Sequence, residues 1–238
     1  MEPGELRRRA WAGVAAQQRL FGEHVPGAKV VQGTGWTGSL VPSAAFSALL
    51  NVAVPEDPRT LPAPAELAGV FEPHGVRWGL WADGAVDLAP QGLAVVSSCR
   101  LMGRALTHVP AHEVQLADPT DDLAWVGALN DRAYGLTDRR LERHFGFIDP
   151  AAVHGHRVGK RATAAALDHD GDASLFFVAT SPSHRRRGYA TAAIKAAIAA
   201  AAARGCTTAS LLATPEGVGL YRRLGFADLG EARLWATR

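Results

Sequence analysis

The chain has 238 residues, a length that suits one large domain or two small ones. Hydrophobic residues make up 47% and charged residues 20%, as in an ordinary protein with a buried core. The formal net charge is only +2, which argues against a nucleic acid as the main partner, because nucleic-acid-binding domains are usually far more basic.

Nothing in the sequence predicts a membrane segment or an oxidising compartment. The longest apolar run, residues 196–203, is far shorter than a membrane span. The first residues lack the basic-then-apolar order of a signal peptide. Cys99 and Cys206 form neither a disulfide framework nor a metal-binding pattern. We therefore expect a cytoplasmic protein with no bound metal and no membrane partner.

The first half of the chain alternates between helical and strand-like segments. Residues 5–21 predict a helix with apolar side chains on one face, and residues 64–71 predict a shorter helix. Trp78 and Trp81 lie three apart in a predicted strand, so we expect one in the core and the other at a cleft between the halves. Strands are predicted over residues 30–41, where Gly33 and Gly35 interrupt the pattern, and over residues 46–54, 76–82, 94–98 and 104–109.

The second half begins with a predicted short strand, residues 114–117, followed by two helices over residues 123–134 and 138–145. Residues 148–159 are predicted to be irregular, and Asp170-Gly171 a hairpin turn. The remaining predicted elements are strands over residues 161–167, 174–180 and 207–214 and a helix over residues 188–204. The fold class is therefore mixed α/β.

One stretch combines a buried strand, a basic loop with a glycine, and the start of an alanine-rich helix. The strand is residues 174–180, and the loop carries Arg185, Arg186, Arg187 and Gly188. Backbone N–H groups in the first turn of a helix have no partner within the helix, and the helix dipole adds positive potential there. Such a stretch is typical of a cradle for phosphate groups.

The same stretch resembles a known family. Arg185-x-x-Gly188-x-Ala190 is similar to the pyrophosphate-binding signature of the GCN5-related N-acetyltransferases, Arg/Gln-x-x-Gly-x-Gly/Ala. A second segment, Leu220-Tyr221-x-x-Leu224-Gly225-Phe226, is similar to the signature in which a helix carries a tyrosine before the last strands of that fold. The resemblance implies a mixed, mostly antiparallel sheet flanked by helices.

The resemblance implies acetyl-CoA as the co-substrate. The central strand and the next one would splay apart, and the acyl carrier would enter the gap. The family often has an asparagine near the start of the tyrosine helix, whereas this chain has Thr214 to Gly217 there, and Thr214 or Glu216 is a candidate substitute. The implied cofactor-binding residues are Val178, Ala179, Thr180, Arg185, Arg186, Arg187, Gly188, Tyr189, Ala190 and Thr191.

Tyr221 is the predicted catalytic residue, since by resemblance its phenol would protonate the departing thiolate. Asn130 and Tyr134, on the helical segment that lines the amine site in the family, are candidate substrate residues. The general base stays open among Glu113, Asp168, Asp170, His154 and His156, and a chain of water molecules is an equal alternative.

The sequence is divided here into two predicted domains. Residues 113–238 would be the acetyl-CoA-binding N-acetyltransferase domain, and residues 1–112 an α/β domain, either a degenerate copy of the same fold or an unrelated extension. The predicted activity is acetyl transfer to a small-molecule amine or a protein amino group by direct attack in a ternary complex. The alternatives are a non-catalytic acyl-CoA-binding module and, more remotely, a nucleic-acid-binding protein. A homodimer is compatible with the sequence, although no feature demonstrates one.

Overall fold

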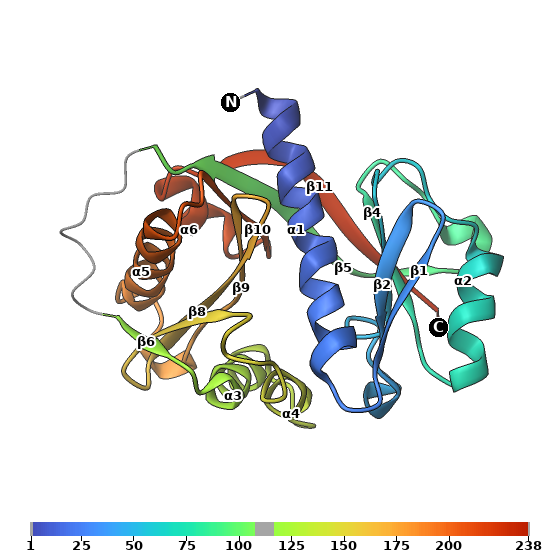
Figure 1. The fold of residues 1–238 in the computed structure, drawn as a ribbon, viewed down its shortest axis with the longest axis horizontal. Helices are drawn as coiled ribbons and strands as arrows, with labels where there is room; N and C mark the ends of the chain where they lie inside the picture. The colour runs from blue at the N-terminus through green and yellow to red at the C-terminus, as the bar shows by residue number, and fades with distance from the viewer. Residues whose placement is uncertain (1, 108–116, 238) are drawn as a thin grey trace.

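The computed structural model describes residues 2–107 and 117–237, and their strands form one mixed sheet of eleven strands (Figure 1). The strand order is β1-β2-β3-β4-β11-β5-β10-β9-β8-β7-β6, and only β3–β4 and β9–β10 pair in parallel. The strands are β1 (Lys29–Gly33), β2 (Trp36–Leu40), β3 (Val52–Pro55), β4 (Gly79–Asp83), β5 (Ala94–Ala105), β6 (Asp118–Thr120), β7 (His154–Val158), β8 (Ala162–His169), β9 (Asp172–Thr180), β10 (Thr208–Ala213) and β11 (Ala227–Ala236).

Helices cover both faces of this sheet, which confirms the predicted fold class. One face carries the long helix α1 together with α3 and α4, and the other carries α2, α5 and α6. Successive side chains of β8 point to opposite faces of the sheet. Ala164 and Ala166 pack toward α5 on one face, and Ala165 packs toward α3 on the other. The helices are α1 (Pro3–His24), α2 (Pro64–Phe71), α3 (Leu123–Tyr134), α4 (Arg140–Phe145), α5 (Tyr189–Ala203) and α6 (Val218–Arg223).

The two halves of the chain exchange strands in the middle of the sheet. Strand β5 comes from the first half but pairs with β10 and β11 of the second, and β11 lies between β4 and β5. Helix α1 crosses the junction and contacts strands of both halves, as Figure 1 shows. The division into residues 1–112 and 113–238 stays a prediction, and its boundary at residues 110–113 lies outside the described residues.

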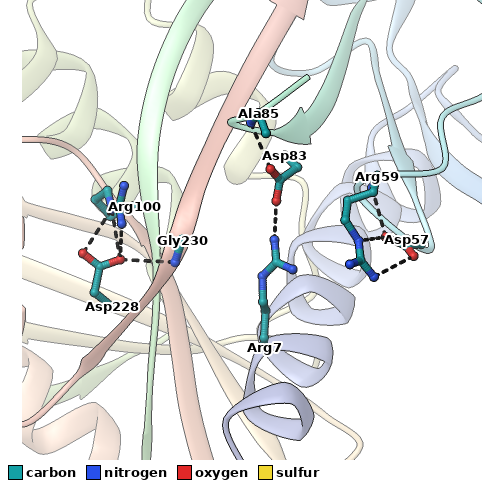
Figure 2. A network of polar contacts seen from close by, with 8 residues as sticks. All are labelled: Arg7, Asp57, Arg59, Asp83, Ala85, Arg100, Asp228 and Gly230. Atoms are coloured by element: carbon teal, nitrogen blue, oxygen red, sulfur yellow. Dashed lines mark hydrogen bonds and ion pairs between the residues drawn. The ribbon is translucent and has the colours of Figure 1, made fainter. Parts of the chain in front are cut away.

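Two arginine–aspartate ion pairs lie near this junction, and one of them joins the two halves (Figure 2). Arg7 of α1 forms an ion pair with Asp83 at the end of β4. Arg100 of β5 pairs with Asp228 of β11 at 2.7 Å, and the same carboxylate accepts the N–H of Gly230 at 3.2 Å, where the β5–β11 register shifts by a bulge. The carboxylate therefore fixes both the bulge and the strand from the other half.

Each half contains a strand–helix–strand unit with parallel strands, and in both units the strands pair only near their start. In the first half, the loop after β3 lies across the strand ends. The N–H of Asp83 donates to the Pro58 carbonyl at 3.0 Å, and the N–H of Glu56 donates to the Gly35 carbonyl at 2.8 Å. The proline-rich loop thus occupies the place where the second half has its basic loop.

Three predicted segments differ from the structure. Residues 94–105 form one strand, because Gly103 allows a close approach rather than a turn: a Cβ there would lie 3.0–3.1 Å from the side chains of Leu229 and Leu6. The segment containing His154 and His156, predicted to be irregular, is strand β7, and Gly155 lets the Thr120 carbonyl of β6 lie against it.

The third difference is the segment before β3, where the predicted strand over residues 46–54 reduces to β3 itself. Asn51 is fully buried, and its amide accepts the N–H of Val41 at 2.7 Å and donates to the Ala44 carbonyl at 2.9 Å. This single side chain closes the turns before β3.

No helix in residues 2–107 or 117–237 combines the length and the apolar character needed to cross a bilayer.

Candidate active site

The parallel strands β9 and β10 separate partway along their length. They pair only from Asp172–Thr208 to Leu175–Leu211, whereas β9 continues to Thr180 and β10 to Ala213. The segments beyond these pairs have no common ladder, so a gap opens between them. Backbone groups of this part of β9 are thereby left for a bound molecule.

A bulge in β9 lies at the point where the strands separate. The β8–β9 register shifts between Thr163–Ala179 and Ala165–Phe176, which leaves one extra residue in β9. Phe177 takes a left-handed conformation with φ of 48°. Its carbonyl oxygen accepts hydrogen bonds from Asn130 Nδ2 at 3.0 Å and from Thr163 Oγ1 at 2.9 Å. Side chains from α3 and β8 therefore hold the bulge in place.

The loop between β9 and α5 forms an open cradle of backbone N–H groups. Gly188 has φ of 81°, and a Cβ built on it would meet no atom within 4 Å. The first intrahelical bond of α5 is donated by Ala192 to the Gly188 carbonyl, so the preceding N–H groups of the helix have no helical partner. Arg186 is also left-handed, with φ of 59°. The positive potential of the helix start and the loop arginines thus faces open space.

Arg185 connects this loop to the opposite helix. Its guanidinium donates to the Ala133 carbonyl in the last turn of α3 at 2.7 Å, where the helix dipole favours a cation. Beside it, the Tyr189 ring is contacted by the Arg161 guanidinium at 5.2 Å and by His184 edge-on at 6.1 Å. The basic loop is therefore held from two sides.

The gap and the cradle belong to one cleft of about 1020 Å³. Its walls come from both halves of the chain: α1, the turn before β3, β4 and β5 on one side, and α3, β9, the basic loop, β10 and α6 on the other. Trp81 lines this cleft, whereas Trp78 stacks on Phe71 in the core at 5.9 Å. The opposite facing of these two tryptophans agrees with the sequence pattern.

Tyr221 projects from α6 into the cleft. The residue is 7% exposed, lines the cleft, and packs its ring edge-on against Phe226 at 5.7 Å. Burial, and then the neighbouring phenol of Tyr134, raise the pKa of Tyr221. The Tyr221 phenol therefore stays protonated at neutral pH and is available as a donor to a molecule in the cleft.

Cys99, Tyr134 and Glu216 are further titratable side chains that line the cleft. Burial raises the pKa of the Cys99 thiol, and the Glu216 charge raises it further. Tyr134 is 54% exposed, because it borders the open cleft, yet desolvation by the walls raises its pKa as well. Cys99 and Tyr134 are thus kept in their neutral forms.

Comparison with known proteins identifies a family for the second half of the chain. Residues 113–226 match the model of the Acetyltransferase (GNAT) family. They are a GNAT acetyltransferase domain. No curated protein matches the chain.

Solved structures match the whole chain, which shows that this GNAT domain and the first half together form a recurring fold. A GCN5-related N-acetyltransferase from Kribbella flavida superposes with a TM-score of 0.68 and 21% identity, over 96% of this chain and 95% of that one. A putative GNAT-family acetyltransferase from Novosphingobium aromaticivorans superposes with a TM-score of 0.63 and 20% identity, over 100% of both chains. At these identities the likeness shows the fold alone.

The structure brings most of the residues predicted for the GNAT cofactor site to the cleft. The exception is Arg187, which is exposed and does not line it. Asn130 and Tyr134 both line the cleft, but Asn130 is fully buried and its amide is bonded to backbone. The predicted residues on the wall are Val178, Ala179, Thr180, Arg185, Arg186, Gly188, Tyr189, Ala190, Thr191 and Tyr221.

The residues considered as general base lie elsewhere. Asp168 is bonded to the Arg204 guanidinium at 2.6 and 2.9 Å and lies 3.6 Å from His154, and neither side chain lines the cleft. The same holds for Asp170, in the β8–β9 turn, and for His156 on β7. Glu113 is outside the described residues. Within residues 2–107 and 117–237, no group of three or more potential metal ligands occurs.

Apart from the tryptophan expected at a cleft between the halves, sequence reasoning did not identify the wall contributed by the first half. Gln17 and Phe21 of α1, Leu49, and Val96 and Cys99 of β5 all line the cleft of the GNAT domain. These residues lie on α1, in the turn before β3 and on β5, and only the tertiary packing of the two halves brings them to the cleft. One feature of the sequence pointed to Glu216 as a site residue, namely its position where the family often has an asparagine.

Proposed function

We propose that this protein transfers an acetyl group from acetyl-CoA to a primary amine by direct attack in a ternary complex. The observation that carries the proposal is the shared cleft: the separated part of β9, the open cradle at Gly188 and the Tyr221 phenol all line it. The acceptor is a small-molecule amine or a protein amino group.

The residues present fit the predicted co-substrate. The pyrophosphate of a CoA thioester needs donors and space for close approach, and the cradle offers backbone N–H groups with nothing within 4 Å of the Gly188 Cβ position. The pantetheine arm carries amides, and the backbone of Val178 and Thr180 in the separated part of β9 would pair with them as a neighbouring strand does. Arg185 and Arg186 would neutralise phosphate charge.

Acetyl-CoA would supply an activated acetyl group as a thioester. The net reaction consumes an ammonium ion and the thioester and yields an N-acetyl amide, a free thiol and one proton: a C–N bond forms and a C–S bond breaks. The protein has to bind both substrates together, take a proton from the ammonium group, and deliver one to the sulfur.

Tyr221 is suited to the last of these tasks. Its raised pKa keeps the phenol protonated, and the residue lines the cleft. The apolar packing around the ring excludes water from the donor's surroundings, which strengthens a hydrogen bond to a developing thiolate.

A thiol-release assay with acetyl-CoA and a panel of amines tests the proposal. We expect release that depends on the amine, and a melting temperature raised by several degrees at saturating acetyl-CoA. If the melting temperature rises but no amine releases thiol, the protein is instead a non-catalytic acyl-CoA-binding module. If neither response appears, the proposed co-substrate is wrong.

A further inference from the structure

Within the described part of the chain, one carboxylate lines the cleft. Glu216 lies in the loop between β10 and α6, five residues before Tyr221, and lines the cleft. It is exposed and forms no hydrogen bond or ion pair within the described part of the chain, which contributes no other acidic side chain to the cleft wall. Tyr134 and Cys99 line the same cleft, and the Glu216 charge raises the pKa of both.

The wall contributed by the first half is mostly apolar, and its polar side chains are Gln17, Gln18 and Ser97. Leu49 and Val96 line the cleft and are 40% and 43% exposed, so their side chains are accessible to a molecule that enters it. Phe21 of α1 lies on the same wall. Apolar side chains of this kind favour an uncharged part of the bound molecule. A charge placed against them would lose hydration without gaining a hydrogen bond.

From these two observations we propose that the acceptor is a small primary amine on an apolar body, with its ammonium group on Glu216 and its body against Leu49 and Val96. The inference rests on the proposed acetyl transfer and assigns the substrate class of that site. Glu216 receives one proton from the ammonium group and passes it to solvent, which leaves a neutral nitrogen for the attack. The bonds that form and break are those of the net reaction above.

The size of the cleft favours a small molecule over a peptide chain. Its volume of about 1020 Å³ has to hold the thioester arm as well as the acceptor. Ligand clefts that accommodate one drug-sized molecule measure about 300–1,000 Å³, so the share left to the acceptor suits a molecule of modest size.

A pair of isosteric amines tests the body of the acceptor. Hexylamine and cadaverine have the same number of heavy atoms, but cadaverine ends in a second ammonium group where hexylamine ends in a methyl group. We expect kcat/KM for hexylamine to exceed that for cadaverine by about tenfold or more, because the second charge would lie against the apolar wall. A lysine peptide is the third substrate, and we expect little turnover of it.

Two variants with matched controls test the two contacts. Glu216→Gln should raise KM for hexylamine by about tenfold, since hydrogen bonds to a charged group are lost, while Glu72→Gln, an exposed glutamate outside the cleft, should not. Val96→Asp should reduce the preference for hexylamine and increase turnover of cadaverine. Val95→Asp is its control, because Val95 is 44% exposed but does not line the cleft.

The outcomes separate this inference from the proposed function. Turnover of cadaverine or of the peptide at or above that of hexylamine would overturn the inference and leave the acetyl transfer standing. An unchanged KM in Glu216→Gln, with acetyl-CoA still raising its melting temperature, would overturn the role of Glu216. Lack of turnover with every amine would instead remove the proposed function, and the inference with it.

Discussion

The side-chain amide of Asn130 donates a hydrogen bond of 3.0 Å to the carbonyl oxygen of Phe177. A residue other than glycine in the left-handed region costs about 1–3 kcal/mol, so the conformation of Phe177 persists only because its surroundings impose it. The side chains of Asn130 and Thr163 both stabilise this conformation by donating hydrogen bonds to the Phe177 carbonyl. Helix α3 therefore determines the backbone geometry of the cleft that the cofactor would enter.

The first prediction concerns this bond. Asn130→Ala should lower the free energy of unfolding by about 1–3 kcal/mol, because the carbonyls of Phe177 and Val126 each lose a buried donor. It should also weaken acetyl-CoA binding, because the bulge is no longer fixed. Urea unfolding and calorimetric titration measure the two effects. Thr163→Val, which removes the other donor to Phe177, should act in the same direction, and normal affinity in both variants would contradict the argument.

The second prediction concerns the cradle. Gly188→Glu should abolish acetyl-CoA binding, because both the side chain and its charge would stand where the phosphates are held. Gly205→Glu is the matched control: it follows the same helix at its other end, has φ of 100°, and also faces open space. Both variants should suffer similar backbone strain, so a loss of binding confined to Gly188→Glu, measured by thermal shift, isolates the effect on the cradle.

The third prediction concerns Tyr221. Tyr221→Phe should lower kcat by about a hundredfold and leave acetyl-CoA binding unchanged, since the ring packing is kept and only the donor is lost. Because burial raises the pKa of the phenol above its usual 10.0, the defect should stay constant across neutral pH. Tyr189→Phe, at the cradle end of the cleft, is the comparison. Equal rates of Tyr221→Phe and the parent protein at every pH would rule out the acid role.

The fourth prediction concerns a buried carboxyl group away from the cleft. Burial raises the pKa of Asp172, which is fully buried and accepts a hydrogen bond from Ser210 at 2.5 Å. Since the folded-state pKa lies above the unfolded value of 3.8, the folded state holds this proton more tightly. The free energy of unfolding should therefore fall as the pH rises from that value through the folded-state pKa.

Asp172→Asn should remove this part of the pH dependence and leave the protein at least as stable as the parent at neutral pH, where the parent has to bury a charge. Urea unfolding at several pH values from mildly acidic to neutral measures the effect. An identical pH dependence in the parent and in Asp172→Asn would show that the carboxyl group does not titrate in this range.

Local sequence predicted the parts of the site that depend on neighbours in the chain. The strand, basic loop and helix around Gly188 are continuous in sequence. The loop and the start of the helix could therefore be predicted from neighbouring residues alone. The same holds for the helix of Tyr221 and for the Asp170-Gly171 turn. Sequence failed where a side chain from elsewhere decides local structure, as Asn51 does for the turns before β3.

The sequence by itself determined the alternation of helices and strands, the cradle and the family, because each depends on residues close together along the chain. Tertiary structure alone decided which groups share the cleft. Strand β5 lies between β10 and β11, which brings Val96 and Cys99 to the same space as Glu216 and Tyr221, more than a hundred residues away. Such pairing depends on long-range hydrogen bonds and packing between the halves, for which local periodicity carries no signal.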